Sequence, residues 1–125
     1  MKRIVWCESE LEMSFCLSLE FDKEVESYRE QPEKFELINY VPDFLVEYRG
    51  AKKVFYEVKP NKLLCNPHIA KRLEEAEKVI TSKGYEFRIW TDKTLSNTKL
   101  ANYKFLYRFH KKPNGYKDIS LKVLN

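Results

Sequence analysis

The chain has 125 residues, of which 43% are hydrophobic and 14% aromatic, and its formal net charge is +4. This length suits one domain with a single hydrophobic core. No apolar run is long enough to cross a bilayer, and the first residues lack a signal-peptide core, so we expect a cytoplasmic protein without a membrane partner.

The cysteine and histidine content gives no support for a zinc site or a disulfide framework. The three cysteines have no CxxC spacing, and the two histidines lie far apart in the sequence. We therefore expect reduced, largely buried thiols. The residues concerned are Cys7, Cys16, Cys65, His68 and His110.

Charge is distributed unevenly along the chain. Residues 1–47 carry 5 basic against 12 acidic side chains, and residues 48–92 carry 10 against 6. Residues 93–125 carry 8 basic side chains and one acidic side chain. An acidic first part is suited to metal ligands and a basic last part to phosphates, although charge runs are usually solvated faces.

The first half of the chain predicts a helix followed by strands. Ser9 is a candidate N-cap for a helix that ends near Glu20, with an apolar stripe of period four. Residues 25–29 and 35–40 are strand candidates, separated by Gln31 and Pro32. Two further apolar runs, residues 44–46 and 54–59, flank a tight turn around Gly50 and predict a β-hairpin.

The second half predicts a long helix and a strand that follows it. Asn66 and Pro67 are a cap and first-turn residue for a helix that Gly84 ends. Residues 87–90 are the next strand, a last helix begins at Ser96 or Asn97, residues 113–115 form a turn, and residues 119–124 form a final strand. A hairpin joined by a helical crossover to another strand indicates an α/β domain with a mixed sheet flanked by helices.

The hairpin carries the residues with the clearest chemistry. If Gly50 is the centre of the turn, Asp43 lies opposite Glu57, and Glu57 and Lys59 share one face of the second strand. Two carboxylates and an ammonium then converge, as in metal-dependent phosphodiester hydrolases. Asp43, Glu57 and the Val58 carbonyl would bind Mg²⁺ or Mn²⁺, and Lys59 would orient the attacking water or offset phosphate charge.

An acid from the first helix would complete this site. Glu12 is our choice, with Glu8 and Glu10 as rivals. Purely structural interpretations stay open. Asp43 is also typical of a turn, and Glu57 and Lys59 of an exposed pair on a solvated strand face. Glu12 also fits a capping box with Ser9.

Motifs spread over about residues 8 to 95 resemble those of TnsA-type endonucleases of heteromeric transposons. They are Glu8-Ser9-Glu10-Leu11-Glu12, Leu19-Glu20-Phe21-Asp22 with Val25, Arg29-Glu30-Gln31-Pro32, Pro42-Asp43-Phe44-Leu45-Val46, Glu57-Val58-Lys59-Pro60 and Trp90-Thr91-Asp92-Lys93. The resemblance implies a restriction-endonuclease-like, PD-(D/E)XK core and Mg²⁺-dependent DNA cleavage. It also implies that Glu12, Asp43, Glu57 and Lys59 occupy the family's four active-site positions.

The resemblance carries further expectations and one departure. Gln31 matches a family motif and is a candidate to support the site residues from behind or to contact DNA, against the simpler interpretation of a turn. About thirty residues follow Lys93, too few for the C-terminal domain through which family members engage other transposition proteins. We therefore expect residues 1–125 to form one nuclease domain, with a core at about 8–95 and a basic extension at 96–125.

The sequence thus predicts a small metal-dependent DNA endonuclease of bacterial, phage or mobile-element origin. Alternatives are a phage packaging or head-completion nuclease, a structure-selective resolvase, and a non-catalytic DNA-binding or assembly protein with the same fold. Expected partners are DNA and a transposase or phage assembly proteins, and a homodimer stays open. Candidate contacts to the DNA backbone are Lys52, Lys53, Lys62, Lys71, Arg72, Lys104, Arg108, Lys111 and Lys112.

Overall fold

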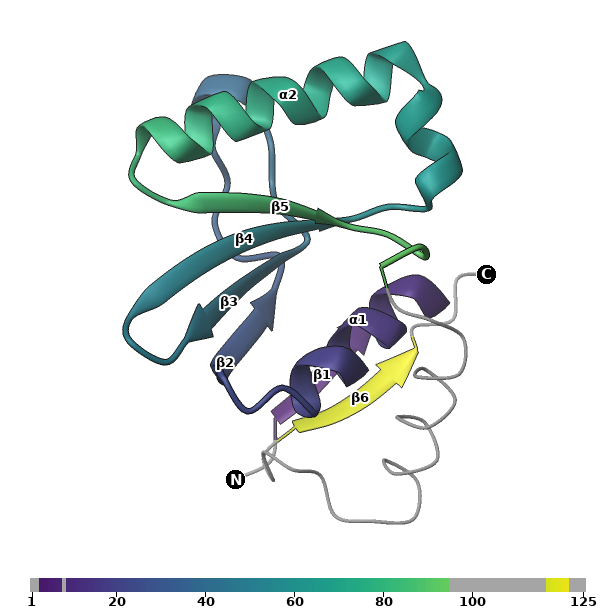
Figure 1. Cartoon of the computed structure of the whole chain (residues 1–125), viewed down its shortest axis with the longest axis vertical. Coiled ribbons are helices and arrows are strands. Elements are labelled where there is room, and N and C mark those ends of the chain that lie inside the picture. Colours follow the sequence, from purple (N-terminus) through teal and green to yellow (C-terminus); the bar gives the residue numbers. More distant parts are fainter. Residues whose placement is uncertain (1–2, 8, 95–116, 122–125) are drawn as a thin grey trace.

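Two β-sheets and two α-helices form the described part of the chain, residues 3–7, 9–94 and 117–121 of a computed structural model (Figure 1). The elements are β1 (Arg3–Cys7), α1 (Glu10–Glu20), β2 (Val25–Glu30), the 3-10 helix η1 (Glu36–Ile38), β3 (Phe44–Tyr48), β4 (Lys52–Val58), the 3-10 helix η2 (Asn61–Cys65), α2 (Pro67–Ser82), β5 (Glu86–Trp90) and β6 (Lys117–Leu121). This arrangement confirms the predicted α/β class and is consistent with a restriction-endonuclease-like core.

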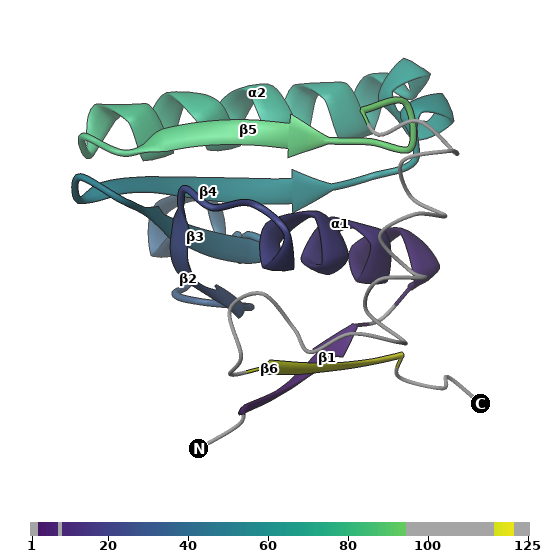
Figure 2. The same ribbon diagram turned by 60° about the horizontal axis from the view of Figure 1, so that its bottom comes forward.

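The larger sheet is mixed and has the strand order β2-β3-β4-β5. Its first three strands are antiparallel, whereas β4 and β5 are parallel and are joined through η2 and α2. The smaller sheet pairs β1 with β6 in parallel. Figure 2 shows α2 on one face of the larger sheet and α1 on the other, with β1 and β6 beyond α1.

The larger sheet is buried on both faces because a helix covers each one. Alternate residues along β3 and β4 contribute to two separate cores. One core contains Phe15 of α1 with Phe44 and Tyr56 of the sheet, and the other contains Ile80 of α2 with Phe55. Residues 54–58 of β4 are consequently all buried, in contrast to the alternation expected of a half-exposed strand.

The β3–β4 hairpin has the predicted register. Phe44 pairs with Tyr56 and Tyr48 with Lys52, so every pair is symmetrical about Gly50. Gly50 and Ala51 both adopt positive φ, of 84° and 66°, which reverses the chain over three residues. This register places Asp43, one residue before β3, level with Glu57 near the end of β4.

Helix α2 also follows its sequence signals. Asn66 caps it by accepting hydrogen bonds from the amides of His68 and Ile69, and Pro67 occupies the first turn. Its buried face comprises Leu73, Ala76 and Ile80, with Ile69 partly buried. The exposed Glu74–Lys78 ion pair is 3.4 Å long, and Gly84 follows the helix with a φ of 88°.

The predicted strand over residues 35–40 is wrong. Phe35 and Tyr40 form an isolated bridge and the chain reverses between them through η1. Asn39 adopts the left-handed conformation, with φ 49° and ψ 54°, which no continuous strand allows. The segment is therefore a tight loop that carries Tyr40 back toward the sheet.

The two ends of the chain differ from expectation in other ways. Strand β1 was not predicted, and the final strand is confirmed in type but spans Lys117–Leu121 instead of residues 119–124. The predicted helix after Ser96 and the turn at residues 113–115 lie outside the described residues.

The cysteines confirm most of what their spacing predicts. All three are free thiols; Cys7 and Cys16 are buried, with sulfur atoms 3.6 Å apart, whereas Cys65 is exposed and departs from the prediction. In the part of the chain that the structure describes, neither helix has the length and apolarity to span a bilayer.

Candidate functional site

The candidate site lies at one edge of the larger sheet. There β4 and β5 end side by side, β3 begins, and α1 starts nearby (Figure 2). The amide of Lys59 donates to the Trp90 carbonyl at 3.0 Å, which keeps the two strand ends together beyond their last pair. In open α/β sheets, ligands bind outside the carboxyl ends of such strands.

Asp43 is held rigidly between β3 and β4. Its amide donates to the carbonyl of Tyr56 at 3.0 Å, and its Oδ2 atom accepts the Val58 amide at 2.7 Å. Oδ1 accepts no hydrogen bond from any residue that the structure describes. The hydrogen bond to Val58 uses Oδ2 and leaves the second carboxylate oxygen available to a ligand.

The ionisation of Asp43 is strongly perturbed. Burial, together with the charge of Glu57, raises the pKa of Asp43 to about 7 from a usual value of 3.8. The Val58 hydrogen bond opposes this rise, Glu12 adds to it, and Lys59 opposes it. A carboxylate whose pKa is strongly shifted by burial and a neighbouring charge is typical of functional sites.

Glu57 is buried, with 4% of the residue exposed, so the alternative interpretation of Glu57 as an exposed residue on a solvated strand face is wrong. The Tyr40 hydroxyl donates a short hydrogen bond to its Oε1 atom. The Lys59 ammonium lies 3.2 Å from its Oε2 atom. The hairpin thus brings together three of the predicted residues, Asp43, Glu57 and Lys59.

Glu12 lies in the first turn of α1. Ser9 caps that helix, since its Oγ atom accepts the Glu12 amide at 3.1 Å, so the capping interaction expected of this pair is present. Glu12 also raises the pKa of Asp43, which means that its charge reaches the site. Within the described residues, however, no three acidic, histidine or cysteine side chains meet closely enough to hold a metal ion. Of the two rival candidates to Glu12, Glu10 is exposed and Glu8 lies outside the described residues.

A groove of about 600 Å³ opens beside these residues. It is lined by Leu11, Pro60, Asn61, Lys62, Asp92 and Lys93. Asp92 accepts the Asn61 amide at 2.6 Å and so ties the end of β5 to the residues that follow Lys59. This hydrogen bond also lowers the pKa of Asp92 below its usual value.

The predicted DNA contacts fall in different places. Lys62 lines the groove beside the site, whereas Lys71 and Arg72 lie on α2. Lys52 and Lys53 begin β4, a seven-residue strand about 20 Å long, so they lie at its far end from Glu57. The other predicted contacts, Lys104, Arg108, Lys111 and Lys112, lie outside the described residues.

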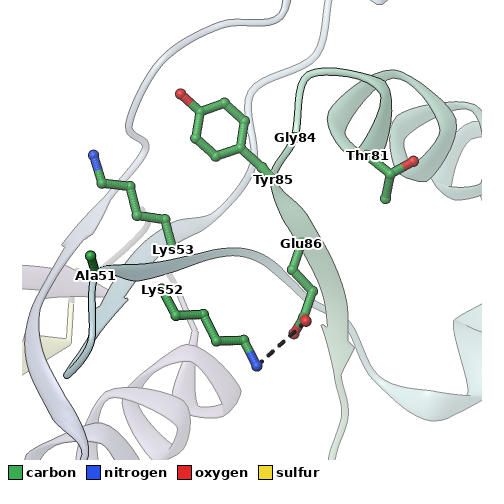
Figure 3. A pocket seen from close by; sticks show the side chains of 7 residues that line it. All are labelled: Ala51, Lys52, Lys53, Thr81, Gly84, Tyr85 and Glu86. Atoms are coloured by element: carbon green, nitrogen blue, oxygen red, sulfur yellow. Dashed lines mark ion pairs between the residues drawn. The ribbon is translucent and has the colours of Figure 1, made fainter.

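The far end of the sheet has a separate groove, shown in Figure 3, of about 470 Å³. Lys52 forms a 3.5 Å ion pair with Glu86 across it, and Lys53 lies 4.0 Å from Glu47 of β3. Both lysines therefore already have acidic partners.

Gln31 connects to the site through its backbone. Its amide donates to the Asp43 carbonyl at 2.8 Å, its φ is 43°, and the residue is exposed. Gln31 thus lies at a bend that follows β2, and its backbone contacts Asp43.

The residue that the sequence did not single out is Tyr40. It is a buried tyrosine whose hydroxyl meets Glu57 across 17 positions of sequence. The only signal in the sequence was the position of Tyr40 itself, an aromatic residue two positions before the Pro42-Asp43 motif.

A model of the family described as TnsA-like endonuclease N terminal matches residues 4–92. The chain belongs to this family. The TnsA-like region begins in β1, ends just after β5 and includes Glu12, Asp43, Glu57 and Lys59. The resemblance drawn from the sequence motifs is therefore confirmed. Membership of an endonuclease family supports the prediction that this protein is a nuclease. No curated protein matched the chain.

Proposed function

We propose that this TnsA-like protein is a metal-dependent DNA endonuclease whose active site is Asp43, Glu57 and Lys59, with Glu12 beside them. The observation that carries the proposal is the pair of neighbouring carboxylates, half-buried Asp43 and buried Glu57, where burial and then repulsion from Glu57 raise the pKa of Asp43 to about 7. A divalent cation at this position would relieve that repulsion, and its chemistry would be to polarise the scissile phosphate and acidify a bound water.

The donor set fits Mg²⁺ or Mn²⁺. Mg²⁺ prefers oxygen ligands, keeps several waters and needs only one or two carboxylates when the substrate supplies phosphate oxygens. Asp43 through Oδ1, Glu57 and the Val58 carbonyl would hold it. The lack of a third side-chain ligand within the described residues does not conflict with such a site.

The protein side chains have separate tasks in this proposal. Asp43 and Glu57 would hold the cation at the sheet edge. Lys59 places an ammonium beside Glu57, where it offsets charge on the phosphate and orients the attacking water. Lys62 and Lys93, in the adjacent groove, would bind the DNA backbone without reading its sequence.

The test is cleavage of supercoiled plasmid with Mg²⁺, with Mn²⁺ and with EDTA. The variants are Asp43→Ala and Lys59→Ala, and Lys78→Ala is a matched control, since Lys78 also pairs with a glutamate but on the exposed face of α2. We expect nicking by the wild type and the control only when metal is present. A folded wild type that does not cut, or an Asp43→Ala variant that does, would overturn the proposal.

A further inference from the structure

Tyr40 holds one side of Glu57. The tyrosine is buried, and its hydroxyl donates to Oε1 while Lys59 occupies Oε2. Both oxygens of the glutamate are thus oriented by neighbours on different segments.

Arg72 of α2 holds Tyr40 in turn. Its Nη2 atom donates to the Asn39 carbonyl at 2.9 Å, and its guanidinium carbon lies 5.6 Å from the centre of the Tyr40 ring. The Tyr40 ring also packs edge-on against Phe87, with centroids 6.4 Å apart. A cation over the ring face and a donor to the preceding carbonyl together restrain this loop.

We propose that Tyr40 is a positioning residue for Glu57. Arg72, through its contacts with Asn39 and Tyr40, couples the position of Tyr40 to that of helix α2. This inference rests on the proposed metal-dependent cleavage, because it assigns the partner that orients one metal-binding carboxylate. Hydrogen-bond partners of metal ligands orient the ligand before the metal arrives, and their loss typically costs about 10- to 100-fold in metal affinity. Arg72 then acts on the site through the protein, in addition to any contact with DNA.

The competing explanation is that Tyr40 merely satisfies a buried carboxylate and so supports folding. The protein contains a matched pair that separates these explanations. Tyr28 is also buried and donates to a buried glutamate, Glu20, at 2.7 Å, in the core on the other face of the sheet. Tyr28→Phe removes a similar hydrogen bond without touching Asp43, Glu57 or Lys59.

The experiment measures Mn²⁺ binding without DNA, by the electron paramagnetic resonance signal of free Mn²⁺, for wild type, Tyr40→Phe and Tyr28→Phe. Circular dichroism melts confirm that each variant is folded. We expect Tyr40→Phe to weaken Mn²⁺ binding at least about 10-fold and Tyr28→Phe to bind like wild type. Equal Mn²⁺ affinities for the two folded variants would overturn the inference while leaving the proposed function intact. A wild type that binds no Mn²⁺ would overturn the inference, whereas the proposed function fails only if the folded wild type does not cut plasmid DNA in the presence of metal.

Arg72→Ala tests the second step. If Arg72 positions Tyr40, this variant loses Mn²⁺ affinity in the absence of DNA. If it is only a phosphate contact, its Mn²⁺ affinity is unchanged, and the slope of log DNA affinity against log salt falls by about 0.9. That second outcome would overturn the role assigned to Arg72.

Discussion

The carboxylate of Asp43 is hydrogen-bonded to the backbone of Val58, with Oδ2 2.7 Å from the amide nitrogen. This contact continues the β3–β4 ladder past its last backbone pair, Phe44 with Tyr56. The position of Asp43 relative to Glu57 is therefore set by the sheet and not by a loop. The proposed metal-binding pair is thus held by two adjacent strands, which provide the rigidity that catalytic geometry requires.

Burial of Asp43 beside Glu57 has a cost in stability when Asp43 ionises, and Asp43→Asn should reveal this cost. The folded-state pKa of Asp43 is about 7, above the usual 3.8, so the folded protein binds more protons than the unfolded chain between these values. The contribution of this group to stability is fully present below about pH 4 and is lost as the pH rises through 7. Asparagine keeps an acceptor for the Val58 amide and removes the charge.

We expect Asp43→Asn to be more stable than wild type at pH 8 without metal, by up to about 4 kcal/mol, with a smaller difference at pH 5. Urea denaturation in EDTA at the two pH values measures this. A difference that is the same at both would show that Asp43 ionises normally in the folded protein.

Cleavage should depend on the same ionisation. Asp43 must lose its proton to bind a cation. At limiting Mg²⁺ the cleavage rate should therefore rise with pH, with the midpoint of the rise near pH 7. More Mg²⁺ should move the midpoint to lower pH, because the cation competes with the proton for the carboxylate. Rates of plasmid nicking against pH at two Mg²⁺ concentrations measure the shift. A midpoint independent of Mg²⁺ would assign the transition to another group.

Lys59 should matter more for cleavage than for folding. Its ammonium is partly exposed and lies 3.2 Å from Glu57, so Lys59→Ala should cost little stability. It should lower the single-turnover rate at saturating DNA about 100-fold or more, and Lys59→Arg should recover part of that loss because the charge remains. Cleavage by Lys59→Ala at the wild-type rate would exclude the lysine from the reaction.

The predictable part of this site lies where the determining signals are local. The turn at Gly50 sets the hairpin register, which in turn places Asp43 level with Glu57. The i,i+2 spacing of Glu57 and Lys59 places them on one strand face, and the structure pairs them. Short-range rules of turns and strand periodicity were sufficient for these three residues.

The remainder depends on contacts between distant segments. Asn39 adopts a left-handed conformation in the middle of an apparently strand-like run, and this reversal brings Tyr40 to Glu57. Glu57 is buried because helices cover both faces of the sheet, which strand alternation alone does not reveal. The pairing of β1 with β6 joins the two ends of the chain, and no local pattern specifies its partner.

Glu12 can be assigned by separating its charge from its place in the helix cap. The Ser9 hydroxyl accepts the backbone amide of Glu12, so Ser9→Ala removes the cap and Glu12→Gln preserves it. We expect Ser9→Ala to lower stability by about 1 kcal/mol with cleavage retained. Glu12→Gln should melt close to wild type and lose cleavage, because in the proposed site the Glu12 carboxylate belongs to the acidic cluster beside Asp43 and Glu57.

Glu10→Gln is the matched control for this last test, since Glu10 lies in the same first turn but is exposed. It reports the effect of removing one acidic charge from the helix N-terminus, which typically costs about 0.3–1 kcal/mol. Melting temperatures and plasmid cleavage rates for the three variants measure both properties. If Glu12→Gln cleaves as well as Glu10→Gln, Glu12 serves the helix alone and the reaction depends on Asp43, Glu57 and Lys59.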